Sequence, residues 1–119
     1  MNDRIQFISH QKKQILLVDF SNCPPDEVEK ISRAVPDYVT TQPRGSVLVI
    51  SDFTGASFDR DAIRTIKETA VFDKPYVKKS ALVGGGNLSE VGQSLREFSG
   101  REFTTFKRRE EAFAWLIED

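Results

Sequence analysis

Residues 47–55 combine a short, continuous apolar run with a polar ending. They read Val47-Leu48-Val49-Ile50-Ser51-Asp52-Phe53-Thr54-Gly55. An apolar run without alternation is typical of a strand that is covered on both faces, as in the parallel centre of an α/β sheet. Ile15–Val18 is a second run of this kind, and the residues between the two runs show helical apolar spacing. The two runs therefore predict neighbouring strands of a parallel sheet.

The residues before this pair predict a hairpin and a helix. Strands are expected at residues 4–9 and 13–20, joined by a polar turn at residues 10–12. A helix then begins at the Pro24-Pro25 pair, because proline suits the first helical turn. Pro36 falls inside its apolar stripe, so we expect a kink or a break there.

The residues after Asp52 predict three further helices and two strands. The expected helices are 59–71, with Asp59 as N-cap, 88–99, with Asn87 and Glu90 as a capping box, and 108–117. The expected strands are 79–83 and 102–106. The order β-β-α-β-α-β-α-β-α predicts an α/β fold over one domain, residues 1–119, with a five-stranded, mixed and mostly parallel sheet. Four helices flank that sheet on both faces.

Composition narrows the class of protein. The 119 residues are 39% hydrophobic and 29% charged, with a formal net charge of −1. This near-neutral balance argues against a dedicated nucleic-acid binder, and the short apolar runs exclude a membrane span. The single Cys23 and single His10 form neither an internal disulfide nor a zinc constellation, and no secretory signal opens the chain. We therefore expect a cytoplasmic protein without metal or cofactor.

Polar residues follow the two apolar strands. Asp19 and Asp52 end neighbouring strands, where two carboxylates bind a metal ion or share a proton, or alternatively form Asx turns. An aspartate-phosphorylated receiver is rejected, because Asp19 stands alone where such proteins need an acidic pair and the opening hairpin is extra. Lys107, Arg108 and Arg109 open the last helix against its dipole, which hints at an anion or partner nearby, although a solvated basic face is the alternative.

A glycine-rich loop lies between the fourth strand and the helix that follows it. It reads Gly84-Gly85-Gly86-Asn87. Backbone N–H groups at a helix N-terminus bind phosphate or carboxylate groups when no side chain hinders them. The spacing matches no phosphate-binding fingerprint, so an anion site and a flexible turn both stay open.

The chain resembles a STAS domain in two stretches. The first is Val47–Phe58, and the second comprises Lys78–Gly84, Phe106 and Glu111–Leu116, which is similar to the SpoIIAA-like branch of bacterial proteins. The resemblance implies a sheet with four flanking helices and no catalytic residues. In anti-sigma-factor antagonists of this family, a serine or threonine that follows an aspartate in the loop after the third strand is phosphorylated. Here Asp59 matches that aspartate, whereas Arg60 and Asp61 replace the hydroxyl residues.

Two functions follow as expectations. The first is a non-enzymatic regulatory module that docks a protein partner or a second copy, without the usual phosphorylation site. Its expected contact residues lie in one loop: Asp52, Phe53, Thr54, Ser57, Phe58, Asp59, Arg60 and Asp61. The alternative is a small-ligand protein of CRAL-TRIO-like character, with an apolar or anionic molecule between the helix after Asp59 and the sheet, near Gly84, Gly85, Gly86 and Asn87. Phe53 and Phe58 either line such a contact or fold back over the sheet.

Overall fold

A computed structural model describes residues 3–118. Its strands are β1 (Ile5–His10), β2 (Lys13–Asp19), β3 (Val47–Asp52), β4 (Val77–Val83) and β5 (Thr104–Phe106). Its helices are α1 (Pro25–Val39), α2 (Arg60–Asp73), the short 3₁₀ helix η1 (Lys74–Tyr76), α3 (Leu88–Ser99) and α4 (Arg109–Leu116). This confirms the predicted order of elements. Within the described residues, no helix has the length and apolarity that crossing a bilayer requires.

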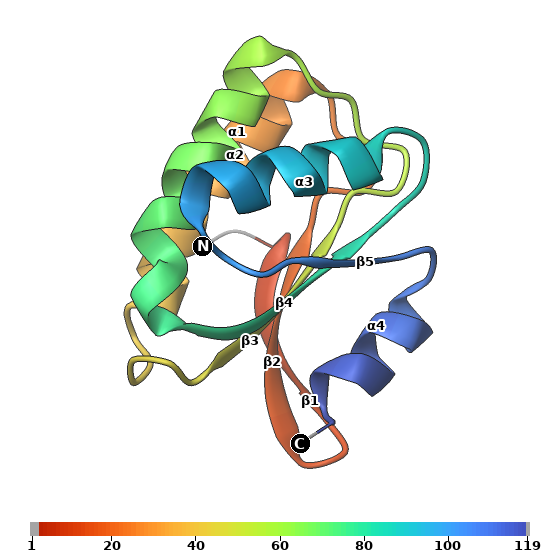
Figure 1. The fold of residues 1–119 in the computed structure, drawn as a ribbon. Coiled ribbons are helices and arrows are strands. Elements are labelled where there is room, and N and C mark those ends of the chain that lie inside the picture. Colours follow the sequence, from red (N-terminus) through yellow and green to blue (C-terminus); the bar gives the residue numbers. More distant parts are fainter. Residues whose placement is uncertain (1–2, 119) are drawn as a thin grey trace.

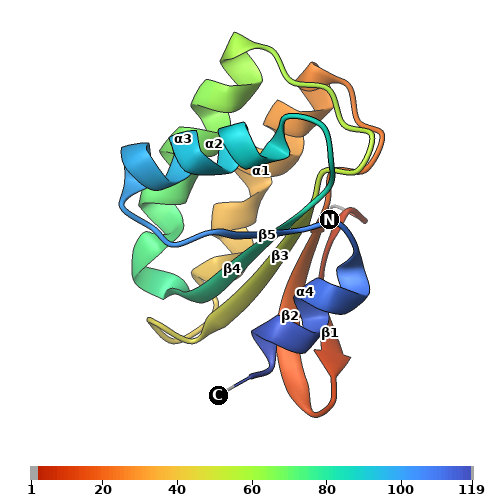
Figure 2. The same cartoon turned by 45° about the vertical axis from the view of Figure 1, so that its right-hand side comes forward.

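The strands form one mixed sheet in the order β1-β2-β3-β4-β5. β1 pairs antiparallel with β2, and each later neighbour pairs in parallel. Because each parallel connection steps to the next strand in the same direction, right-handed crossovers place the connecting helices on one face. Figures 1 and 2 show α1, α2 and α3 over this face and α4 alone on the other.

The two faces of the sheet bury two separate apolar clusters. Alternate strand residues point to opposite faces, so Val49 faces α1–α3 whereas Leu48 and Ile50 face α4. The larger cluster fills the space under α1, α2 and α3, and Ile31 of α1 and Leu95 of α3 are almost fully buried there. The smaller cluster holds α4 through Ala112 and Leu116. The helices on both faces agree with the prediction, although their distribution is uneven.

Three local expectations are wrong, in whole or in part. His10 is the last residue of β1, and the turn consists of Gln11 and Lys12, which both have positive φ. α1 continues through Pro36 to Val39, so of the expected kink or break the break does not occur. This is possible because the apolar side chains of α1 are buried against the rest of the protein. Their packing stabilises the helix by more than the loss of the one backbone hydrogen bond that proline removes.

The N-terminus of α3 also differs from the expected capping box. Asn87 occupies the N-cap position, but its side chain makes no capping hydrogen bond, and the N–H of Glu90 donates to the Asn87 carbonyl oxygen at 3.1 Å. Its ψ of 18° is the reason, since a capping residue normally has extended backbone. Asp59 before α2 has that extended backbone, and its carboxylate accepts from the N–H of Ala62 at 2.8 Å, as predicted.

Candidate functional site

The carboxyl ends of β2 and β3 bring Asp19 and Asp52 together. The two residues are direct partners in the parallel register. Each carboxylate closes a turn on its own chain: Asp19 accepts from the N–H of Ser21 at 3.0 Å, and Asp52 accepts from the N–H of Thr54 at 2.9 Å. These contacts are the Asx turns of the second alternative.

Arg109, at the first turn of α4, forms ion pairs with both carboxylates, and Nη1 of Arg4 lies 3.6 Å from Asp19 Oδ1 as well. Arg109 Nε donates to Asp52 Oδ2 at 2.6 Å, and Arg109 Nη2 lies 3.3 Å from Asp19 Oδ1. Burial raises the pKa of Asp52, but hydrogen bonds from Thr54 and Arg109 outweigh burial, so the net pKa lies below its ordinary value. Within residues 3–118, no group of three His, Cys, Asp or Glu side chains is placed to hold a metal ion. Of the three basic residues at the start of the last helix, Arg109 thus has anionic partners inside the protein.

The loop from Asp52 to Asp61 turns its aromatic side chains inward. The ring of Phe53 is buried and stacks on Phe20 with centroids 4.4 Å apart, and Phe58 packs against Phe53 at 5.3 Å. The two phenylalanines thus fold back over the sheet, the second of the two alternatives. The exposed residues of the loop are polar or small: Thr54, Gly55, Ser57, Asp59, Arg60 and Asp61.

The glycine loop lies beside this loop at the same edge of the sheet. Gly84 has a φ of +150°, and a Cβ there would lie 3.4 Å from the backbone of Phe53. Gly85, Gly86 and Asn87 are exposed and, with Phe53 and Phe58, line a shallow surface hollow. The structure therefore brings the two predicted loops together, in a hollow that faces solvent.

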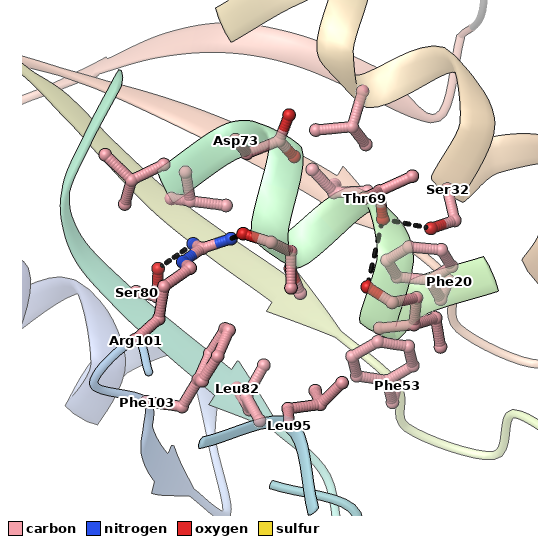
Figure 3. Close-up of a pocket in the computed structure, with 17 residues that line it drawn as sticks. Phe20, Ser32, Phe53, Thr69, Asp73, Ser80, Leu82, Leu95, Arg101 and Phe103 are labelled. Atoms are coloured by element: carbon pink, nitrogen blue, oxygen red, sulfur yellow. Dashed lines mark hydrogen bonds between the residues drawn. The ribbon is translucent and has the colours of Figure 1, made fainter. Parts of the chain in front are cut away.

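A second site lies in the interior, between the sheet and the helices α1, α2 and α3. It is a cavity of about 50 Å³, and no exposed residue lines it. Figure 3 shows Ser80 and Arg101 beside Phe103 on one side of it, and Ser32 and Thr69 beside Phe20 on the other. Its apolar walls are Val18, Phe20, Val35, Val49, Phe53, Ile66, Ala70, Val77, Leu82, Leu95 and Phe103, and its polar walls are Ser32, Ser51, Thr69, Asp73, Ser80 and Arg101.

Asp73 is the last residue of α2 and is 5% exposed. Its Oδ1 has no hydrogen-bond partner. Every other buried side-chain oxygen or nitrogen within residues 3–118 has one. Burial raises the pKa of Asp73 from 3.8 to about 7, although the positive charge of Arg101 offsets part of the increase. The carboxyl end of a helix also disfavours negative charge. Neutral pH therefore leaves this carboxyl group partly protonated.

Arg101 follows α3 and places its guanidinium at the same end of the cavity. Nη1 donates to the Ala70 carbonyl oxygen at 3.1 Å, and Nη2 donates to Ser80 Oγ. The guanidinium carbon lies 4.7 Å from the centre of the Phe103 ring. Burial lowers the pKa of Arg101 to about 10, so the group stays charged at neutral pH. The two hydrogen bonds use two of the five N–H groups of an arginine.

The sequence predicts, as its alternative, a ligand between the helix after Asp59 and the sheet, but it identifies neither Asp73 nor Arg101 as part of that site. One local signal pointed to Asp73, since an aspartate in the last turn of a helix opposes the helix dipole where lysine or arginine is favoured. No local signal marks Arg101, because its contacts with Ala70 and Ser80 lie 31 and 21 residues away along the chain.

The comparisons with known proteins place the fold. No protein-family model matches the chain, and no curated protein matches it. A solved structure is similar: an uncharacterized protein from the DUF3478 family with a SpoIIAA-like fold, from Shewanella loihica PV-4. The similarity has a TM-score of 0.70 at 18% sequence identity and covers 95% of this chain and 92% of that one. The mixed sheet, the opening hairpin and the four helices of this protein thus form a SpoIIAA-like fold, as the resemblance to STAS domains implied.

Proposed function

We propose that this protein is a non-enzymatic regulatory domain whose interior cavity binds a small molecule. The observation that supports this function best is the unpartnered Oδ1 of Asp73 inside the cavity. Buried polar atoms are almost always hydrogen-bonded, and an unsatisfied one costs about 1–3 kcal/mol. A ligand with a polar group removes that cost, and the apolar side chains of the lining suit a small hydrophobic part.

The position of the cavity suits regulation. Its walls come from the sheet and from α1, α2 and α3, so an occupant contacts both layers of the domain at once. A ligand that binds only the native state stabilises it, and it stabilises most the arrangement of helices that it contacts. α2 forms a wall of the cavity and also carries exposed side chains on its outer side. Occupancy of the cavity is thereby connected to the surface that α2 presents.

Methyl NMR tests this function, because the sheet supplies its own control. Val49 and Leu82 line the cavity, whereas Ile50 and Val83 occupy the same strands and face α4. A set of small polar fragments is added to protein labelled at its isoleucine, leucine and valine methyl groups. We expect shifts of the cavity methyl resonances alone. A set of fragments that leaves them all unmoved contradicts the proposed function.

A second candidate function is the docking of a protein partner or a second copy. The observation that favours it is an exposed apolar group at the ends of α2 and α3: Val71 is 46% exposed, and Phe72 and Phe98 are each 56% exposed. The expected docking surface is the loop from Asp52 to Asp61 with the helix that follows, α2. Val71 and Phe72 belong to that helix, whereas Phe98 lies on α3. Phe98 lies beside α2, since Nζ of Lys67 is 5.7 Å from the centre of its ring, and exposed apolar side chains on adjoining helices favour a contact.

Sedimentation analysis of the wild type and of Phe98→Ser tests docking between copies. Phe98 is largely exposed, so the change to serine leaves the core intact. Self-docking predicts concentration-dependent association that the variant weakens. A wild type that stays monomeric at every concentration argues against the second copy as the partner.

A further inference from the structure

We propose that the interior cavity binds a small carboxylate of one or two carbon atoms, held between the guanidinium of Arg101 and the carboxyl group of Asp73. This inference rests on the proposed function and names the ligand class of the same site. Four properties of the cavity support it: its charge, the geometry of its donors, its one unpartnered acid and its size.

The charge of the cavity favours an anion. Arg101 is cationic at neutral pH, and it forms no ion pair with Asp73 although both line the cavity. When the carboxyl group of Asp73 is protonated, the cavity holds a positive charge without a counter-charge. Because a buried charge is expensive unless it is paired, a small anion beside Arg101 stabilises the folded protein.

The donors match a carboxylate. A guanidinium presents its N–H groups as a planar fork that pairs with the two oxygens of a carboxylate. Arg101 still has N–H groups that no atom of residues 3–118 accepts. The ring of Phe103 covers one face of this guanidinium and so fixes its plane. Ser80, which accepts from the same guanidinium, lies on the cavity wall as well.

The acid of Asp73 completes the site when it carries a proton. A protonated carboxyl group donates one hydrogen bond, whereas an ionised one only accepts and repels an anion. Burial raises the pKa of Asp73 to about 7, so both forms occur near neutral pH.

No other charged group faces Asp73 from the elements around it. Within the described residues, α1 contributes Ser32 and Val35 to the cavity, β3 contributes Val49 and Ser51, β4 contributes Val77, Ser80 and Leu82, and α2 contributes Ile66, Thr69 and Ala70. The preceding strand β2 contributes Val18. The neighbouring Lys74 is exposed to solvent. The protonation of Asp73 therefore depends on Arg101 and on the ligand.

The volume limits the ligand. A cavity of roughly 150 Å³ holds benzene, with its six carbon atoms. The volume here is about 50 Å³, a third of that, which suits formate and, at most, acetate. Very small ligands bind weakly even in good sites, so we expect a Kd of about 1 mM.

The experiment measures binding of sodium formate and sodium acetate by methyl NMR at pH 6 and at pH 8, with ionic strength held constant by sodium chloride. Formamide and acetamide serve as uncharged probes of the same shape. Only the protein with protonated Asp73 binds the anion well, so the apparent Kd varies inversely with the protonated fraction. With the pKa of Asp73 at about 7, we expect the carboxylates to bind about tenfold more weakly at pH 8 than at pH 6. The amides are expected to show no such change.

Two variants locate the effect. Asp73→Asn is expected to keep carboxylate binding and to lose its dependence on pH. Arg101→Met is expected to abolish binding, with Arg64→Met as the control, because Arg64 is an exposed arginine that lies outside the cavity. Arg101→Met removes two internal hydrogen bonds and can prevent folding. In that case the pH dependence of carboxylate binding by the wild type tests the inference.

The outcomes separate this inference from the function on which it rests. Amide binding equal to carboxylate binding, or tighter carboxylate binding at pH 8, overturns the inference and leaves a cavity that binds small molecules. Absence of shifts with carboxylates and amides overturns the inference alone if other fragments move the cavity methyl resonances. Absence of shifts with every fragment overturns both.

Discussion

Asp73→Asn is expected to stabilise the protein at pH 8 more than at pH 5. In the wild type, burial raises the pKa of Asp73 from 3.8 to about 7, with Arg101 offsetting part of the increase. The folded protein therefore keeps a proton at a pH where the unfolded chain has lost it. Asparagine has nearly the same shape as the protonated acid and cannot ionise, so it removes this penalty.

The sign and size of the effect follow from the two pKa values. Between pH 3.8 and pH 7 the folded state binds more protons than the unfolded state, so the free energy of unfolding falls as pH rises. The fall is about 1.4 kcal/mol for each pH unit, which gives about 3 kcal/mol between pH 5 and pH 7. Well above pH 7 both states have lost the proton and the contribution stays constant.

Urea denaturation of both proteins at pH 5 and at pH 8 measures this contribution. All other titrating groups are shared, so their effects cancel when the variant is subtracted from the wild type. We expect the stability advantage of Asp73→Asn to be greater at pH 8 than at pH 5 by about 3 kcal/mol. A difference below about 0.5 kcal/mol, the usual size of a surface substitution, refutes the reasoning, because Asp73 would then titrate as a solvated carboxyl group.

Three further predictions concern the edge of the sheet and the core. Asp52→Asn is expected to lower the free energy of unfolding at neutral pH by about 2 kcal/mol in urea denaturation, because it weakens a charge-assisted hydrogen bond to α4. The lowered pKa of Asp52 means that this loss shrinks as pH falls through the pKa of the folded state, and a loss that does not depend on pH would contradict it. Gly84→Ala is expected to lower the free energy of unfolding by about 1–2 kcal/mol, because the φ of Gly84 is +150° and the new Cβ would lie 3.1 Å from Leu88. Gly85→Ala, with open space around it, should be nearly neutral, and equal effects of the two changes in thermal unfolding would refute this. Burial raises the pKa of Cys23, so its thiol should react with a disulfide reagent far more slowly in the native than in the unfolded protein, and equal rates would show that it is exposed.

The order of elements was predictable because it rests on local patterns. Continuous apolar strands and helical stripes are properties of neighbouring residues, and the Asp59 cap is a contact across three residues. The failure at Asn87 has the same origin, since a cap also needs extended backbone, which the preceding glycines do not impose. Pro36 was misjudged because tertiary packing outweighs a local helix breaker.

The interior site was not predictable in the same way. Asp73 becomes a buried acid only when α1 and the sheet close over the end of α2, and Arg101 reaches the same cavity from the segment between α3 and β5. A single sequence does not show which charged residues such long-range packing buries. The edge of the sheet shows the opposite case, because the parallel register of β2 and β3 brought Asp19 and Asp52 together as expected. Their partner Arg109 comes from α4, at the other end of the chain.

The central claim is that the cavity beneath α2 is the binding site, and filling it tests the claim most directly. Ala70 lines the cavity and is 4% exposed, so Ala70→Val places two further carbon atoms inside it. We expect this variant to fold with unchanged or raised thermal stability and to lose the formate-induced methyl shifts of the wild type. Formate binding at the affinity of the wild type, in a folded Ala70→Val protein, would contradict the claim.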